Sequence, residues 1–201
     1  MAYSDFTLKK VVQEFQLTLS EDENLFADIP SVSPSDFLIE TLNENVPLAL
    51  SISTEKARSE LIIINLFIEL RKKYHHKISL FSGVKFDVDS EKNLNGFCDF
   101  IISSSPEQLF ITAPIIAVVE AKNENIISGL GQCIAEMIAA QQFNAEEKQS
   151  ISTIYGIVTT GNAWKFLKLQ TRTVSIDSKE YHIDNTAKIL GILAAMIEQK
   201  A

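Results

Sequence analysis

The apolar run at residues 115–119 is the feature that most limits the folds open to this chain. Its sequence, Ile-Ile-Ala-Val-Val, carries no polar side chain, and four of its five residues are β-branched. Such a run is typical of a strand that is buried on both faces at the centre of a sheet. The chain therefore needs further strands beside this segment and helices on the two faces of the sheet.

The rest of the sequence supplies these elements in a definite order. A helix is predicted at residues 54–74, because acidic residues populate its start and three basic residues its end. Alternating or continuous apolar patterns predict strands elsewhere, with Gly83 as a candidate bulge. The expected elements are strands at 77–89, 97–103 and 109–122, a helix at 126–143, strands at 151–159 and 164–170, a hairpin within 172–183 and a helix at 186–199. This order predicts an α/β (α+β) fold, with a mixed central sheet and flanking helices.

Charge separates the N-terminal segment from the rest. The formal net charge of the chain is −8, and residues 1–53 carry 9 acidic and 2 basic side chains, a net of −7. Periodicity predicts a helix at 6–17, and Ser35 is a candidate cap for a second short helix after Pro30 and Pro34. We expect residues 1–53 to form an acidic, largely helical N-terminal arm, and residues 54–201 to form the core domain.

Two positions are open for this arm. If it covers the groove near Asp99, its charge would imitate nucleic acid and hold the free protein inactive. If it packs on the far face of the core, a homodimer contact is expected instead. Both versions follow from apolar positions in the arm that need a partner surface.

Composition excludes several classes of protein. With 46% hydrophobic and 22% charged residues, the chain has the composition of an ordinary globular domain. No apolar run reaches the roughly 18 residues of a membrane span, and the N-terminus shows no secretory signal. Cys98 and Cys133 lie in apolar stretches, which excludes a disulfide framework and predicts two buried thiols in a reducing, cytoplasmic setting.

Polar residues within the apolar strands indicate where chemistry is expected. Asp99 interrupts the apolar segment 97–102, and a carboxylate there is costly to bury unless it is paired or bound to a metal. Glu120 and Lys122 end the 115–119 run, and the strand period of two puts them on one face, about 7 Å apart. Two adjacent strands would thus aim two carboxylates and an ammonium at one point. The structural alternative is a strand-end ion pair of Glu120 with Lys122, and a polar Asp99 near a turn.

This arrangement resembles the PD-(D/E)XK nuclease superfamily. Asp99 is followed by Glu120-x-Lys122, with a helix that bears Glu60 before them and a helix that bears Gln132 after them. The restriction endonuclease-like core of that superfamily runs helix, three strands, helix, strand, as expected here over residues 54–159. Cys98 stands where the family name has a proline, a permissive position.

A second segment adds to this resemblance. Residues 157–166 contain a Thr-x-Gly-x-x-Trp pattern that ends at Trp164. The pattern resembles the strand–turn–strand of nuclease domains in type I restriction subunits. Trp164 and Phe166 could stack on a base, but their spacing in a strand favours a place in the core. Together the resemblance covers roughly residues 54–170.

The resemblance implies an endonuclease that hydrolyses DNA phosphodiester bonds with Mg²⁺, or Mn²⁺ as a substitute, within a restriction or defence system. Asp99, Glu120 and Glu60 would bind the metal, and the metal would activate a water. Lys122 would orient that water or neutralise transition-state charge. Gln132 would line the site. Glu60 and Gln132 each have an ordinary helical role as the alternative.

The balance of charge limits how the core would bind DNA. Residues 54–170 carry 12 basic and 13 acidic side chains, a net of −1. A nearly neutral core makes few phosphate contacts, so DNA binding is expected to be weak without a partner subunit and to depend little on salt. The alternative function is a non-catalytic binding or assembly module that keeps the nuclease fold.

Overall fold

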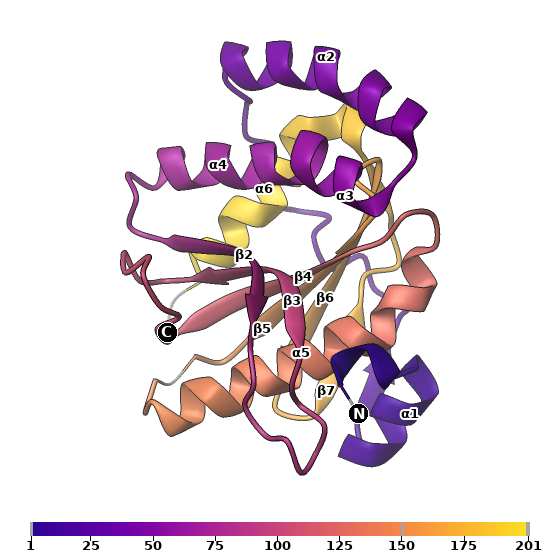
Figure 1. Cartoon of the computed structure of the whole chain (residues 1–201), viewed down its shortest axis with the longest axis vertical. Helices are drawn as coiled ribbons and strands as arrows, with labels where there is room; N and C mark the ends of the chain where they lie inside the picture. Colours follow the sequence, from indigo (N-terminus) through magenta and orange to yellow (C-terminus); the bar gives the residue numbers. More distant parts are fainter. Residues whose placement is uncertain (1, 150, 200–201) are drawn as a thin grey trace.

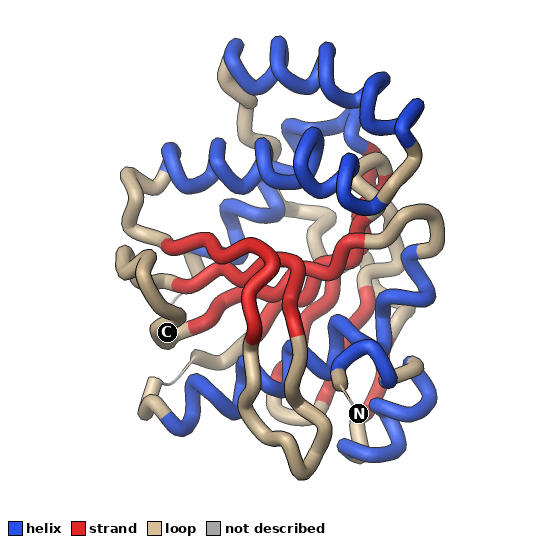
Figure 2. The backbone as a smooth tube through the Cα atoms, in the orientation of Figure 1, coloured by secondary structure: helices blue, strands red, loops and turns tan. Residues whose placement is uncertain are grey.

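The computed structural model describes residues 2–149 and 151–199. A mixed eight-stranded sheet runs through the molecule, between two layers of helices (Figure 1, Figure 2). The strand order is β1-β7-β6-β5-β4-β3-β2, and β8 pairs with β6. The pairs β1–β7 and β4–β5 are parallel, and the other pairs are antiparallel. The strands are β1 Thr18–Ser20, β2 Ser79–Lys85, β3 Phe97–Ser103, β4 Ile115–Ala121, β5 Ile154–Thr159, β6 Ala163–Gln170, β7 Thr173–Ile176 and β8 Tyr181–His182.

Helices cover both faces of this sheet. Figure 1 shows α1 and α5 on one side and α2, α4 and α6 on the other. The helical segments are η1 Tyr3–Asp5, α1 Leu8–Phe15, α2 Asp36–Ile52, α3 Glu55–Arg58, η2 Ser59–Ile63, α4 Ile64–Lys73, α5 Ile126–Glu146, η3 Ile183–Asn185 and α6 Thr186–Ile197. The predicted mixed sheet with flanking helices is confirmed. Across residues 54–159 the order is helix, three strands, helix, strand, as expected.

The sequence of β4 explains why this strand lies inside the sheet. Every residue of β4 is buried. Val119 packs into the core under α4 and α6, whereas Val118 packs into the core under α5. The apolar run therefore fills both layers at once, as a doubly covered strand must.

The predicted helix at 54–74 is helical throughout, but it is not uniform. Thr54 caps its start by accepting a hydrogen bond from the N–H of Ala57 at 3.2 Å. The segment η2 is π-helical and joins α3 to α4. Such wider turns inside a helix frequently occur at functional sites. Here two residues of the π-helical segment, Ser59 and Glu60, line a cavity together with Asp99 of β3.

The N-terminal segment is mostly helical, as expected, but it is built into the sheet and both cores. β1 pairs in parallel with β7, and Thr18 N–H donates to the Arg172 carbonyl at 2.9 Å. Phe26 and Leu38 belong to the core on the α4 and α6 side, and Phe6 to the core on the α5 side. The expected boundary at residue 53 therefore does not separate two cores.

The second helix of this segment is longer than expected. Ser35 caps α2 by accepting a hydrogen bond from the N–H of Leu38 at 3.2 Å, as predicted, but α2 runs on to Ile52. Pro47 lies inside it. Pro47 has no N–H to donate to the carbonyl of Asn43, one turn earlier. Asn43 and Pro47 line a surface cavity, so water can reach the carbonyl of Asn43.

Two local expectations need correction. Gly83 has a φ of +60°, but the β2–β3 register is the same on both sides of it, so no extra residue is inserted as a bulge. The predicted hairpin within 172–183 is not formed, because β7 and β8 both pair with β6 instead of with each other. β6 is long enough to hold both strands at different positions.

Other expectations are confirmed. Cys98 and Cys133 are free, buried thiols. Trp164 and Phe166 are fully buried and belong to the core under α4 and α6. Within residues 2–149 and 151–199, no helix combines the length and the apolar character needed to cross a membrane.

Candidate functional site

Asp99 and Glu120 lie on neighbouring strands where the β3–β4 ladder ends. The last paired residues at this end are Phe100 and Val119. One residue further on, the Asp99 carboxylate accepts a hydrogen bond from the backbone N–H of Ala121 at 2.7 Å. The side chain thus serves as the acceptor that a strand carbonyl supplies elsewhere in the ladder.

Glu120 is almost completely buried, with 2% of its surface exposed. Its Oε1 accepts a hydrogen bond from the ammonium of Lys122, which also forms an ion pair with it. Its Oε2 accepts a hydrogen bond from Nε2 of Gln132 at 2.8 Å. Both carboxylate oxygens therefore have a donor, one from the strand end and one from α5.

Burial and mutual repulsion shift the acidity of these groups. Burial, together with the negative charge of Asp99, raises the pKa of Glu120 to about 7. Burial also raises the pKa of Asp99, although the Ala121 N–H and Lys122 oppose it. Burial lowers the pKa of Lys122, but the facing Glu120 outweighs it and the net shift is upward. The ammonium is thus held in its charged form beside two carboxyls that protonate easily.

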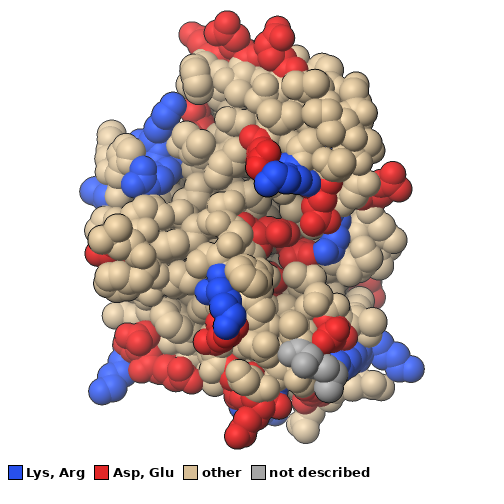
Figure 3. Space-filling view, in the orientation of Figure 1, with Lys and Arg blue, Asp and Glu red and all other residues tan. Residues whose placement is uncertain are grey.

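A cavity of about 260 Å³ lies beside Asp99, between the start of α3 and strands β2 and β3. We call it the α3 cavity. Figure 3 shows acidic side chains gathered in a hollow at the middle of this face. All of the described residues that line the cavity follow residue 53, so the N-terminal arm does not cover it. They are Glu55, Lys56, Ser59, Glu60, Ser82, Gly83, Asp99 and Phe100.

Two carboxylates, Glu55 of α3 and Glu60 of η2, border the α3 cavity. The Glu60 side chain is 61% exposed, and its carboxylate pairs with Lys56 at 3.0 Å. Glu55 interacts electrostatically with the residues at the strand ends. Burial raises the pKa of Glu55, the charge of Lys122 lowers it, and the charge of Asp99 raises it. The sequence pointed to Glu60 alone. The position of Glu55 directly after the cap at Thr54 does not distinguish it from any other acid in a first helical turn.

A stripe along α5 faces Glu120 and Lys122. Gly129 leaves room for the Lys122 side chain, because a Cβ at this glycine would lie 3.1 Å from Cγ and Cε of Lys122. Gln132 follows three residues later and donates to Glu120. Glu136, one turn beyond Gln132, accepts from the same Nε2 at 3.1 Å and is fully buried. The structure thus brings Gln132 together with Glu120, and it adds Glu136, which sequence reasoning missed.

Arg58 of α3 forms hydrogen bonds with the segments that follow β4 and β5 beside this site. Its side chain is buried, and its guanidinium donates to Asn123 Oδ1 at 3.2 Å and to the Thr160 carbonyl at 2.9 Å. The turn at Thr160 is held in place by Trp164, whose Nε1 donates to the Gly161 carbonyl at 2.9 Å. The Thr-x-Gly-x-x-Trp pattern thus has a structural role beside the acidic residues.

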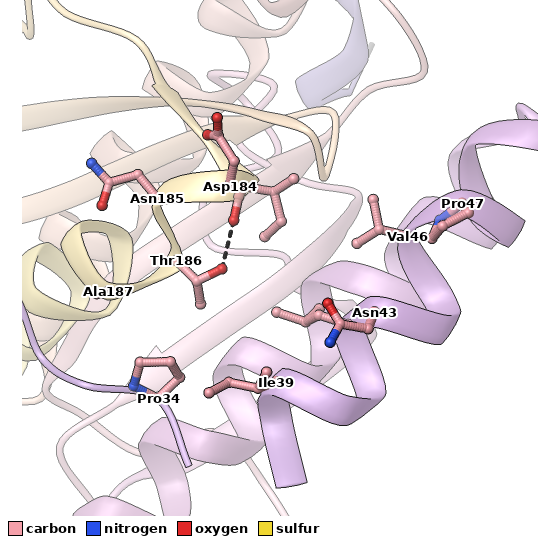
Figure 4. Close-up of a pocket in the computed structure, with 11 residues that line it drawn as sticks. Pro34, Ile39, Asn43, Val46, Pro47, Asp184, Asn185, Thr186 and Ala187 are labelled. Atoms are coloured by element: carbon pink, nitrogen blue, oxygen red, sulfur yellow. Dashed lines mark hydrogen bonds between the residues drawn. The ribbon is translucent and has the colours of Figure 1, made fainter. Parts of the chain in front are cut away.

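A larger cavity of about 490 Å³ lies away from these residues, between α2 and the start of α6 (Figure 4). Its walls include Ile39 and Val46 of α2 and a carboxylate, Asp184, before α6. Thr186 Oγ1 donates to the Ile183 carbonyl there at 2.5 Å. None of Asp99, Glu120 and Lys122 lines this cavity.

The donor set at the strand ends fits a metal that needs few protein ligands. Among the described residues, no group of three or more His, Cys, Asp or Glu side chains is arranged to hold an ion. Mg²⁺ requires less, because it keeps several waters and binds one or two carboxylates together with substrate phosphates. Asp99 and Glu120 offer such hard oxygens. Comparison with known proteins adds nothing to this geometry, since no family model, curated protein or solved structure matches the chain.

Proposed function

We propose that this protein is a metal-dependent endonuclease that hydrolyses DNA phosphodiester bonds. The observation that carries the proposal is the end of the β3–β4 ladder, where Asp99 and Glu120 lie on neighbouring strands with the Lys122 ammonium on Glu120. The element order over residues 54–159 supports it, because it is the order of the PD-(D/E)XK core that the sequence resembles.

In this proposal Asp99 and Glu120 hold Mg²⁺ or Mn²⁺, and Glu60 or Glu55 contributes from the opposite wall of the α3 cavity. When bound, the metal polarises a phosphoryl oxygen and lowers the pKa of a coordinated water. The α3 cavity is open to solvent and gives a phosphodiester a route to Asp99. Restriction to DNA, and a place in a restriction or defence system, rest on the sequence resemblance.

Lys122 supplies positive charge where the reaction develops negative charge. Its stem lies in the space that Gly129 leaves, and its side chain is 22% exposed. An ammonium fixed there can stabilise the phosphoryl oxygens in the transition state without first reorganising. Gln132 keeps the second oxygen of Glu120 oriented by its hydrogen bond.

A second candidate function is a non-catalytic binding or assembly module with the same fold. One observation favours it: the acidic groups already have protein partners. Glu120 is satisfied by Lys122 and Gln132, and Asp99 by the Ala121 N–H. A network that satisfies its own polar groups can persist for stability alone.

Cleavage assays on the full chain separate the two functions. Supercoiled plasmid, linear DNA and RNA are incubated with protein in Mg²⁺, Mn²⁺, Ca²⁺ or chelator. We expect DNA cleavage with Mg²⁺ and Mn²⁺, none with Ca²⁺ or chelator, and none by Glu120→Gln or Lys122→Ala. The matched control is Glu124→Gln, because Glu124 is an exposed acid close to the end of β4. This variant should cleave normally.

Binding measurements complete this test. Calorimetric titration should show that the wild type binds Mn²⁺ and that Glu120→Gln does not. DNA affinity should be low for the isolated chain and should fall only gently with salt, because a nearly neutral core is expected to make few phosphate contacts. A protein that neither binds Mn²⁺ nor cleaves would establish the non-catalytic function. Cleavage that persists in chelator would reject the metal mechanism.

A further inference from the structure

Glu136 is a buried acid that the proposed mechanism does not use. It lies on the inner face of α5 and is 0% exposed. Its Oε1 accepts a hydrogen bond from Gln132 Nε2 at 3.1 Å, and its Oε2 has no hydrogen-bond partner among the described residues. A buried polar group of this kind is costly, and its presence in the core needs an explanation.

The amide of Gln132 lies between two carboxyl groups. The same Nε2 donates to Glu120 Oε2 at 2.8 Å and to Glu136 Oε1 at 3.1 Å, so both of its protons are used. With an acceptor on each side, the NH₂ group rather than the amide oxygen must face Glu120. Without Glu136, one proton of this NH₂ group would lose its protein acceptor, and only solvent could replace it at the half-buried Gln132.

The surroundings of Glu136 favour an uncharged acid. Among the described residues it has no ion pair, since the nearby cation, Lys122, is paired with Glu120. Burial holds the pKa of Glu136 well above its usual value, and the repulsion of Glu120 raises it further. An unpaired carboxylate in such a place takes up a proton.

The phenol and the two thiols near Glu136 do not supply a compensating positive charge. They are Tyr3 of η1, Cys98 of β3 and Cys133 of α5. Burial raises the pKa of each of them, so all three are neutral near pH 7. The proton of Glu136 belongs on Oε2, because Oε1 accepts from Gln132.

We propose that Glu136 is a positioning residue, an uncharged acceptor that holds the Gln132 amide in the orientation that donates to Glu120. The inference rests on the proposed function, because its purpose is to fix the Glu120 carboxylate for metal binding. Groups that orient a metal ligand typically change metal affinity by about 10- to 100-fold when they are removed. A neutral acceptor does this without placing a third negative charge beside Asp99 and Glu120.

Three variants of the full chain test this role. Glu136→Gln keeps an oxygen that accepts from Gln132 and cannot ionise. Glu136→Leu has a similar size but no acceptor. Met137→Leu is the matched control, a change of shape at the next buried residue of α5 that removes no hydrogen bond. Each variant is measured for Mn²⁺ affinity and, without metal, for its midpoint of urea denaturation.

The expected pattern separates positioning from stability. In Glu136→Leu, Mn²⁺ affinity should fall about tenfold or more, while the urea midpoint should stay the same or rise, because a buried acid is replaced by an apolar group. In Glu136→Gln and Met137→Leu, affinity should stay within about twofold of the wild type. A residue with only a structural role would not lower metal affinity while stability is kept.

A measurement without metal tests the geometry on its own. In the metal-free wild type and in Glu136→Gln, both side-chain amide protons of Gln132 should exchange slowly with solvent by NMR, and in Glu136→Leu one should exchange faster. Equal exchange in all three proteins would overturn the inference, as would unchanged Mn²⁺ affinity in Glu136→Leu or an equal loss in Glu136→Gln. A wild type that binds no Mn²⁺ would reject the proposed function and this role together.

Discussion

The carboxylate of Asp99 lies 2.7 Å from the backbone nitrogen of Ala121 and accepts its hydrogen bond. The two strands are thus held together by a side chain at the point where their main-chain pairing ends at Phe100 and Val119. Asp99 therefore contributes to the fold as well as to the proposed metal site. The contribution of Asp99 to stability can be separated from its contribution to metal binding by comparing a variant that keeps the hydrogen bond to Ala121 with one that loses it.

We expect Asp99→Asn and Asp99→Ala to have different effects on stability but the same effect on metal binding. Asparagine keeps an oxygen for the Ala121 N–H, whereas alanine leaves that buried donor unsatisfied, which costs about 1–3 kcal/mol. Both variants lose the charge that binds Mn²⁺. Urea denaturation and calorimetric titration measure the two effects. Equal stability of the two variants would show that the hydrogen bond contributes nothing.

The raised pKa of Glu120 makes the stability of the protein depend on pH. The folded protein binds this proton more tightly than the unfolded chain, in which the pKa is near 4.5 rather than about 7. The stability that Glu120 contributes is therefore fully present below pH 4.5 and is lost as the pH rises toward 7. We expect the free energy of unfolding, measured by urea denaturation, to fall across this window.

The matched variants assign this slope to one residue. Glu120→Gln removes the titrating group, so its stability should vary less between pH 4.5 and 7 than that of the wild type. Glu124→Gln changes an exposed acid and should keep the wild-type slope. Part of the slope should remain in Glu120→Gln, because burial also raises the pKa of Asp99 and Glu136. Identical slopes in all three proteins would contradict the assignment.

Two glycines on α5 are expected to respond differently to alanine. Helix propensity alone predicts that each change stabilises the helix by about 1 kcal/mol. At Gly131 a Cβ would lie 2.4 Å from the backbone carbonyl oxygen of Phe6 and 2.6 Å from the nitrogen of Leu8, and backbone cannot move aside easily. Gly131→Ala should therefore destabilise the protein by about 1–3 kcal/mol.

At Gly129 the nearest atoms belong to side chains, Val158 at 2.8 Å and the flexible Lys122 at 3.1 Å. Gly129→Ala should therefore displace Lys122, with a smaller loss of stability than Gly131→Ala. DNA cleavage should fall more in Gly129→Ala than in Gly131→Ala, although it is the more stable variant. Urea denaturation and the cleavage assay measure this reversal, and the same order in both measurements would contradict it.

The parts of the site that the sequence predicted follow from local patterns. The run before Glu120 and the strand period of two depend only on neighbouring residues, so they place Glu120 and Lys122 at the end of a buried strand. Asp99 was identified because a carboxylate in an apolar strand is costly. Gln132 followed from the resemblance, and in the structure its amide donates a hydrogen bond to Glu120.

Residues whose role depends on packing between distant elements were not visible in the sequence. Glu136 looks like an ordinary helical acid until α5 is placed on β4, because only the sheet makes it buried. Glu55 has the same pattern as any acid in a first helical turn. β1 has only three residues, too few for a period, and it is a strand because β7 offers it an open edge.

The place of residues 1–53 in both cores leads to the last prediction. A fragment of residues 54–201 should not fold, because it lacks the strand that covers β7 and the side chains that α2 adds to the core under α4.

Single substitutions on α2 give the matched test in the full chain. Leu38 is 2% exposed and Phe37 is 63% exposed. Leu38→Ala should cost about 2–5 kcal/mol, and Phe37→Ala much less.

Circular dichroism and urea denaturation measure both parts of this prediction. The fragment should lack a cooperative unfolding transition, and its exposed β7 edge should favour aggregation. A fragment that unfolds cooperatively would show that the N-terminal segment is an attachment to an independent domain. An unfolded fragment would show that the residues lining the α3 cavity depend on the segment for their fold, in agreement with the place of the segment in both cores.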